Sequence, residues 1–218
     1  MKRLFAVDEW KVTEEGLHPK ENRLAESITS LGNGHMGMRG NFEEDYSNDT
    51  HQGFYVAGVY YPDKTRVGWW KNGYPEYFAK VLNATNVIGL RVVINGTPVD
   101  LAKWEVKDFT RELDMQRGVL TRTFTLMNGT EETKVEVVRF FSIVDKEVLA
   151  IRYNVTPVNY EAKIEFTPYL DGDVVNEDSN YDEKFWLPVD RGVEERFAFV
   201  TTKTKKLDWH VTASMIAD

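Results

Sequence analysis

The feature that most constrains the fold of this chain is an alternation of apolar and polar side chains that recurs along its second half. Leu120, Phe124 and Leu126 fall on one face of an extended segment, and threonines fall on the other. Since successive side chains of a strand point to opposite faces, this spacing predicts a strand with one buried face. The same period of two recurs in residues 134–141, 148–155, 162–166, 197–200 and 209–213.

Short turn sequences separate these segments. Asn95-Gly96 and Asn128-Gly129 each lie between two apolar runs, and Asn-Gly is the dipeptide favoured in two-residue hairpin turns. No segment has the 3.6-residue apolar period of an amphipathic helix. With roughly fourteen candidate strands about ten residues apart, the chain is predicted to be all-β and antiparallel, with two stacked sheets and few or no helices.

Composition excludes several classes of function. The net charge is -8 and no run of basic residues is longer than Lys205-Lys206, which argues against nucleic acid and anionic membranes as partners. There is no cysteine among the 218 residues, so disulfides and thiolate metal sites are excluded. No apolar stretch approaches the ~20 residues of a membrane span, and the N-terminus lacks a signal-like apolar run. We expect a cytoplasmic protein without a cofactor.

Four glycines occur between residues 32 and 40, and three of them, Gly32, Gly34 and Gly37, have the G-x-G-x-x-G spacing of a dinucleotide-binding loop. That loop requires a strand before it and a helix directly after it. Arg39 and Gly40 follow instead, without a helical apolar period, so we interpret the segment as a turn region. We expect it to be non-helical, with at least two glycines at positive φ.

The residues around these glycines resemble a known family. Residues 31–44 read LGNGHMGMRGNFEE, which is similar to the N-terminal signature of the disaccharide phosphorylases of glycoside hydrolase family 65. Further segments resemble that family in the same order along the chain: residues 55–60, 111–122, 138–142 and 170–176.

The resemblance implies a fold and a function. Its N-terminal domain is a β super-sandwich similar to galactose mutarotase, followed by an (α/α)6 barrel that carries the catalytic glutamate and the phosphate site. Residues 1–218 would be that sandwich, a truncated piece of a larger enzyme, with the catalytic barrel absent and the fragment inactive. The parent enzyme, of the maltose or kojibiose phosphorylase type, would convert a disaccharide and phosphate to β-glucose 1-phosphate and glucose. A family hydrolase such as a trehalase is the alternative.

The resemblance also implies two kinds of protein partner. The sandwich would pack against the missing catalytic domain of the same polypeptide, and it would support a homodimer of the parent enzyme. Disaccharide and inorganic phosphate would be ligands of the parent and not of this fragment.

The residues that carry the resemblance are expected to be structural and not catalytic. They are Gly32, Asn33, Gly34, Gly37, Arg39, Gly40, Phe42, Glu43, Glu44, Asp114 and Arg122. Adjacent residues of a strand point to opposite faces, so Glu43 and Glu44 are not expected to flank one glycosidic bond; one would cap or pair, and the other would be solvated. We expect Arg39 to bind backbone carbonyls or Glu43 and to lock the turn, with phosphate as the alternative.

Two further sets of side chains are candidates for ligand binding. His35 and His51 lie near the glycines, but two isolated histidines do not predict a metal site. Trp69, Trp70 and Tyr74 form an aromatic segment that would serve either as an interface or as a sugar-stacking platform. In the second case the chain would be a carbohydrate-binding module.

Overall fold

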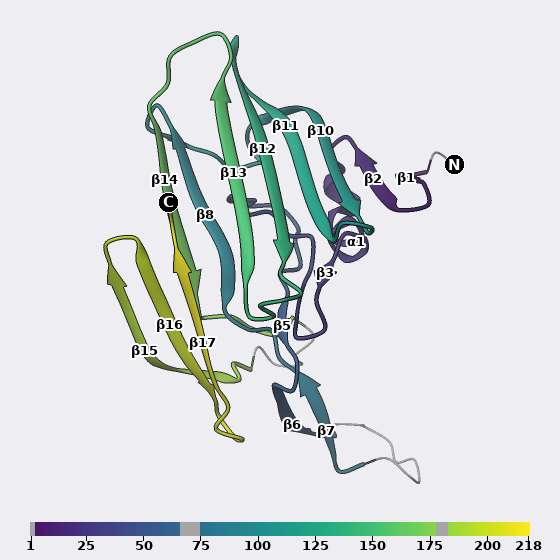
Figure 1. The fold of residues 1–218 in the computed structure, drawn as a ribbon, viewed down its shortest axis with the longest axis vertical. Helices are drawn as coiled ribbons and strands as arrows, with labels where there is room; N and C mark the ends of the chain where they lie inside the picture. The colour runs from purple at the N-terminus through teal and green to yellow at the C-terminus, as the bar shows by residue number, and fades with distance from the viewer. Residues whose placement is uncertain (1–2, 66–74, 178–182) are drawn as a thin grey trace. The chain divides into compact units, whose positions relative to one another are not determined.

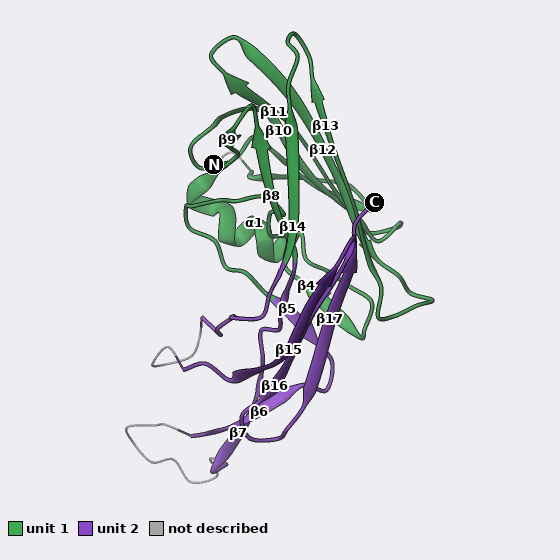
Figure 2. Cartoon of the chain, turned by 90° about the vertical axis from the view of Figure 1, so that its left-hand side faces the viewer, with its two compact units in different colours: residues 1–53, 88–169 green, residues 54–87, 170–218 purple. Residues whose placement is uncertain are grey.

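The computed structural model describes residues 3–65, 75–177 and 183–218. Within them the chain forms seventeen strands, one α-helix and one short 3-10 helix, which confirms the all-β prediction. The chain divides into two compact units (Figure 2): unit 1 comprises Met1–Gly53 and Ile88–Tyr169, and unit 2 comprises Phe54–Val87 and Leu170–Asp218. Among the described residues, no helix is long and apolar enough to cross a membrane.

Unit 1 is built on a six-stranded antiparallel sheet, in the order β1-β2-β10-β11-β12-β13 (Figure 1). Its strands are β1 (Phe5–Val7), β2 (Lys11–Glu15), β10 (Glu105–Asp114), β11 (Val119–Asn128), β12 (Glu131–Phe141) and β13 (Leu149–Pro157). A second sheet has the order β14-β8-β9, with β8 (Asn86–Ile94), β9 (Thr97–Pro98) and β14 (Ile164–Asp171). Asn95 and Gly96 both have positive φ, 48° and 80°, as the predicted type I′ turn requires.

The core of unit 1 lies between these two sheets, as the alternation predicts. Leu120, Phe124 and Leu126 are buried, whereas Thr121 and Thr123 of the same strand are half-buried. The main buried cluster joins Phe42, Phe109, Phe124, Leu126, Val135 and Val137 to Val92, Ile94, Val99 and Leu101. Apolar residues from both sheets therefore interdigitate, which is the packing of a β-sandwich.

Unit 2 contains an antiparallel sheet in the order β15-β16-β17 and a hairpin of β6 and β7. The strands of this unit are β5 (Phe54–Val56), β6 (Tyr60–Lys64), β7 (Tyr77–Val81), β15 (Trp186–Glu194), β16 (Phe197–Thr204) and β17 (His210–Ile216). Asn176 joins two parts of the unit, because its Oδ1 accepts from Asn83 N at 3.0 Å and its Nδ2 donates to Val81 O at 2.8 Å. Trp69, Trp70 and Tyr74 lie outside the described residues.

Helix α1 (Asn22–Ile28) directly precedes the glycine segment and follows the 3-10 helix η1 (Pro19–Glu21). Unlike an ordinary amphipathic helix, it buries polar side chains and leaves large apolar side chains exposed. Asn22 and Glu26 are fully buried, while Leu24 and Ile28 are 50% and 39% exposed. The helix therefore has no apolar period along its buried face, which is why the sequence pattern does not predict it.

The glycine segment forms a small hairpin between β3 (Leu31–Gly32) and β4 (Met36–Met38). It is non-helical, as predicted, and strand β4 occupies the place of the helix that a dinucleotide loop requires. The expectation of two glycines at positive φ is wrong, since only Gly34 has one, at 86°. Gly40 is needed for space instead: an added Cβ would overlap the buried Thr29 Oγ1.

We expect Gly40→Ala to lower the free energy of unfolding by about 2–3 kcal/mol, because the methyl group would displace Thr29 and the packed backbone around it. Gly37→Ala is the matched control in the same segment. Its Cβ would meet nothing nearer than Leu31 O at 3.7 Å, so we expect a change of less than about 1 kcal/mol. Urea unfolding followed by tryptophan fluorescence measures both, and equal effects would contradict the steric role of Gly40.

Candidate functional site

Three arginines lie side by side on the buried face of the six-stranded sheet, and we call them the arginine row. Arg111 of β10, Arg122 of β11 and Arg139 of β12 are each at most 1% exposed. Arg111 and Arg122 are direct cross-strand partners, and Arg139 pairs with Leu120, two residues before Arg122. The row occupies positions where the surrounding strands place Leu, Phe and Val, so each guanidinium needs acceptors within the core.

The acceptors for Arg122 are the two acids that end the glycine signature. Its Nη1 and Nη2 donate to Glu44 Oε1 and Oε2 at 2.7 and 2.6 Å, which is a bidentate pair. Nη2 also donates to Glu43 Oε2. Both carboxylates are thus bound to one guanidinium.

The expectation that one of these acids is solvated is therefore wrong. Glu43 and Glu44 are only 3% and 4% exposed. The opposite-faces rule applies to extended strands, but residues 43–44 form a bend. Both side chains consequently reach the same partner.

The other two arginines bind backbone carbonyls of the signature. Arg139 Nη1 donates to Asn41 O at 3.0 Å and to Glu43 Oε1 at 2.9 Å, and its Nη2 donates to Arg39 O at 3.1 Å. Arg111 Nη1 donates to Gly40 O at 2.9 Å. Three successive carbonyls, from residues 39 to 41, are held by the row.

Arg111 also connects the row to the N-terminal strand and the helix. Its Nε donates to Glu14 Oε2 at 2.9 Å, and its Nη2 donates to Asn22 Oδ1 at 3.1 Å. Phe42 lies between two members of the row, with its ring centroid 5.0 Å from Arg111 Cζ and 4.8 Å from Arg122 Cζ. These contacts allow an aromatic ring to pack against guanidinium groups in the core.

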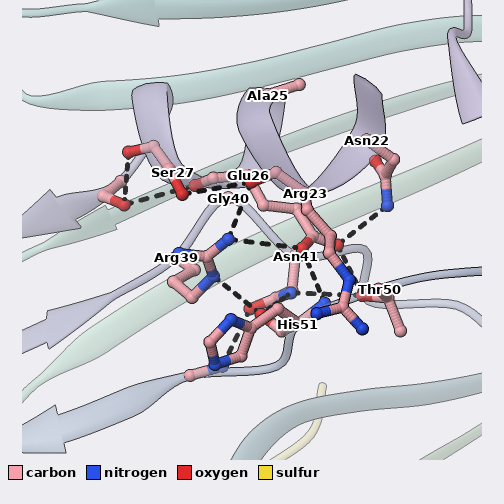
Figure 3. A network of polar contacts seen from close by, with 12 residues as sticks. Asn22, Arg23, Ala25, Glu26, Ser27, Arg39, Gly40, Asn41, Thr50 and His51 are labelled. Atoms are coloured by element: carbon pink, nitrogen blue, oxygen red, sulfur yellow. Dashed lines mark hydrogen bonds and ion pairs between the residues drawn. The ribbon is translucent and has the colours of Figure 1, made fainter. Parts of the chain in front are cut away.

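Arg39 is held by a second network, which links the segment to helix α1 and to His51 (Figure 3). Its Nε donates to His51 O and its Nη2 to Arg23 O, both at 2.7 Å, and Glu26 Oε2 lies 3.7 Å from Nη2. The expected binding of Arg39 to backbone carbonyls is confirmed, but its acidic neighbour is Glu26 and not Glu43. These bonds fix the turn at Gly40, whose N donates to Glu26 O at 2.7 Å.

The pKa shifts follow from burial and from this pairing. Burial by itself raises the pKa of Glu43, but Arg122 and Arg139 outweigh burial, so its pKa is lowered. Burial disfavours the charge of Arg122, yet Glu44 and Glu43 raise its pKa above the usual value. A general acid at neutral pH needs a raised carboxyl pKa, so the environment of Glu43 is opposite to that of a general acid.

Burial also raises the pKa of Tyr153 well above its usual value, and the neighbouring Glu44 carboxylate adds to this effect. Burial lowers the pKa of both Arg111 and Arg139. Across the two networks four arginines, 39, 111, 122 and 139, meet four glutamates, 14, 26, 43 and 44. The four positive and four negative charges of these two networks therefore balance.

Asp114, Asn33 and His51 also have structural contacts. Asp114 Oδ1 accepts from Arg117 N at 2.9 Å and so closes the turn between β10 and β11. Asn33 bridges to the loop after β12. His51 contributes its backbone to the Arg39 network, and within the described ranges no group of three or more His, Asp or Glu residues is arranged to hold a metal.

Sequence reasoning did not select Glu14, Glu26, Arg111 or Arg139 as site residues. A signal for Arg139 is present, because it lies between Val137 and Phe141 on one face of the predicted strand 134–141. Arg111 has the same spacing, between Phe109 and Leu113, but in a segment that is not among the predicted strands. A charge at such a position predicts a buried partner. The identity of that partner has no local signal.

We expect Arg122→Met to lower the free energy of unfolding by about 3–5 kcal/mol, because Glu43 and Glu44 would be left buried without their main counter-charge. Arg152→Met is the matched control on the same sheet. Arg152 pairs with Glu136 at 3.0 Å, but its side chain is 66% exposed, so we expect a loss below about 1 kcal/mol. Urea unfolding at neutral pH compares the two variants, and a small effect of Arg122→Met would contradict the structural role of the row.

The lowered pKa of Glu43 predicts a loss of stability in acid. Its folded pKa lies below the ordinary value of 4.5, so its contribution is complete well above pH 4.5 and is lost as the pH falls through the folded pKa. The difference in unfolding free energy between wild type and Glu43→Gln should be constant near neutral pH and shrink below pH 4.5. A difference that instead grows in acid would mean that the pKa of Glu43 is raised in the folded protein. Glu136→Gln, at an exposed ion pair, serves as the control.

Comparison with known proteins identifies the family of this chain. The family model described as "Glycosyl hydrolase family 65, N-terminal domain" matches residues 12–217. The chain is 47% identical to maltose phosphorylase of Bacillus subtilis over 93% of its own length and 27% of that protein. It is 30% identical to kojibiose phosphorylase of Thermoanaerobacter brockii over 79% of its own length and 21% of that protein.

A solved structure is similar as well. The chain superposes with a TM-score of 0.84 and 25% sequence identity on a putative kojibiose phosphorylase from the human microbiome, covering 99% of this chain and 28% of the other. The chain thus spans about a quarter of the length of the relatives that it matches. The match over residues 12–217 and the identity to maltose phosphorylase show that the chain belongs to glycoside hydrolase family 65, as its N-terminal domain.

Proposed function

We propose that this chain is the non-catalytic N-terminal domain of an inverting α-glucosidic disaccharide phosphorylase of the maltose phosphorylase type. The observation that carries the proposal is the 47% identity to maltose phosphorylase over 93% of the chain. Identity to kojibiose and trehalose phosphorylases of Thermoanaerobacter brockii is 30% in each case. Among these substrates the comparison therefore favours maltose.

In the proposed parent reaction, inorganic phosphate attacks the anomeric carbon of the non-reducing glucose. The bond between that carbon and the bridging oxygen breaks, a new carbon–oxygen bond to phosphate forms on the opposite face, and the bridging oxygen takes up a proton. The products are β-glucose 1-phosphate and glucose. This chain would supply no group to that chemistry.

The assignment of a non-catalytic role is supported by the state of the signature carboxylates. Glu43 and Glu44 are buried and bound to Arg122, and Glu14 and Glu26 are fully buried with partners of their own. A catalytic carboxyl has to reach the substrate. The charged groups of the signature instead hold the domain together as a rigid support.

We further propose that this support packs against the catalytic part of the same polypeptide and contributes to a homodimer. Carbohydrate and phosphate would bind to the catalytic part. A cytoplasmic location suits the reaction, since phosphate is a co-substrate.

The test is an assay of the complete polypeptide and of residues 1–218 with maltose and phosphate. We expect the complete polypeptide to release β-glucose 1-phosphate, identified by its anomeric proton and phosphorus resonances, and to use kojibiose and trehalose at least ~10-fold less efficiently, a difference of about 1.4 kcal/mol in the activation free energy. Residues 1–218 alone should give no product.

Three results would overturn the proposal. Phosphate-independent release of glucose by the complete polypeptide would identify a hydrolase. A clear preference for kojibiose or trehalose would show that maltose is not the preferred substrate. Calorimetric binding of maltose to residues 1–218 alone would identify a carbohydrate-binding domain.

A further inference from the structure

Asn33 uses its whole amide group to join two loops of unit 1. Its Nδ2 donates to Ser142 O at 2.6 Å and to Lys146 O at 2.9 Å. Its Oδ1 accepts from His35 N at 3.0 Å and from Met36 N at 2.8 Å. One side chain therefore ties the glycine hairpin to the connection between β12 and β13.

That connection, residues 142–148, also has a fixed internal shape. Ser142 N donates to Val148 O at 2.9 Å, and Val148 N donates to Asp145 O at 2.8 Å. Asp145 N donates to Ser142 Oγ at 2.9 Å. Together with the two bonds from Asn33, these contacts leave the loop little freedom to fold its apex back onto the domain.

The apex of this fixed loop is apolar. Ile143 is 85% exposed and Val144 is 91% exposed. Val148, in the same loop, is 47% exposed, and Phe140, near the end of β12, is 41% exposed. We call these four side chains the apolar apex. Single exposed apolar residues are ordinary, but adjacent apolar residues that are almost fully exposed on a loop of fixed shape are typical of an interaction surface.

We propose that the apolar apex packs against the part of the same polypeptide that lies outside these 218 residues, and that Asn33 is the positioning residue that presents it. The inference rests on the proposed function, which requires such a part. The family model that matches is an N-terminal domain, and the matched region is 27% of the maltose phosphorylase of Bacillus subtilis. About three quarters of the relative's length therefore lies elsewhere.

Covalent linkage favours this occupant over any free partner, because a tethered surface is present at a high effective concentration. A second copy of this chain is the alternative occupant, and its binding would depend on protein concentration, so dilution distinguishes the two. The apex itself carries no charge, whereas Asp145, Lys146 and Glu147 border it. The surface that receives it should accordingly be apolar at its centre and polar at its rim.

The test measures how accessible position 144 is in the complete polypeptide. The 218 residues contain no cysteine, so Val144→Cys introduces the one thiol of this domain, and its labelling by a maleimide is followed by mass spectrometry of the peptide that contains it. Val193→Cys and Val7→Cys are matched controls, because these valines are 83% and 65% exposed. We expect Val144→Cys to react at least ~10-fold more slowly than both controls, as a thiol buried by packing is shielded from reagent.

A second variant tests the role of Asn33. Asn33→Asp keeps the acceptor oxygen for His35 N and Met36 N but removes both donations to residues 142 and 146. In this background Val144→Cys should label several-fold faster, while Val193→Cys should be unchanged. No acceleration would overturn the positioning role.

Equal labelling of the three thiols would overturn the docking proposal. Protection of position 144 that disappears on dilution would also overturn it, by showing that a second molecule covers the apex. The phosphorolysis assay on the same samples separates the two proposals. Product with equal labelling rejects only the docking site, whereas absence of product rejects the proposed function.

Discussion

A guanidinium on the apolar face of a sheet has to obtain its acceptors from another part of the chain, and this requirement organises unit 1. Arg111, Arg122 and Arg139 have no acceptors among the Leu, Phe and Val side chains of their own face. Their partners come from β2, from Asn22 of α1 and from residues 39–44. Breaking such a buried pair from one side leaves an uncompensated charge, so the sheet and the signature segment depend on each other.

This dependence gives residues 40–44 a structural role within unit 1. Gly40 is small because Thr29 occupies the space beside it, and its carbonyl is an acceptor for Arg111. Glu43 and Glu44 are acidic because Arg122 lies opposite them. Each residue is chosen by a contact inside the domain, and the chemistry of the family is proposed to reside in a part of the polypeptide that this chain does not contain.

Much of the fold could be predicted from the sequence, because burial selects alternate residues of strands such as β11 and because Asn95-Gly96 defines its own turn. The rest depends on contacts that leave no local pattern. Helix α1 buries Asn22 and Glu26 and exposes Leu24, so it has no apolar period to detect. The shared partner of Glu43 and Glu44 follows from a bend, and the link between Glu14 and Arg111 joins residues 97 positions apart.

The same long separations have a consequence for the order of folding. The β10–β11 and β11–β12 hairpins are local, whereas Glu44 and Arg122 are 78 residues apart and Asn41 and Arg139 are 98 apart. Closing large loops is slow compared with forming hairpins. We therefore expect the β10–β12 hairpins to form while their arginines are still hydrated. The signature segment would dock later and displace that water when the core closes.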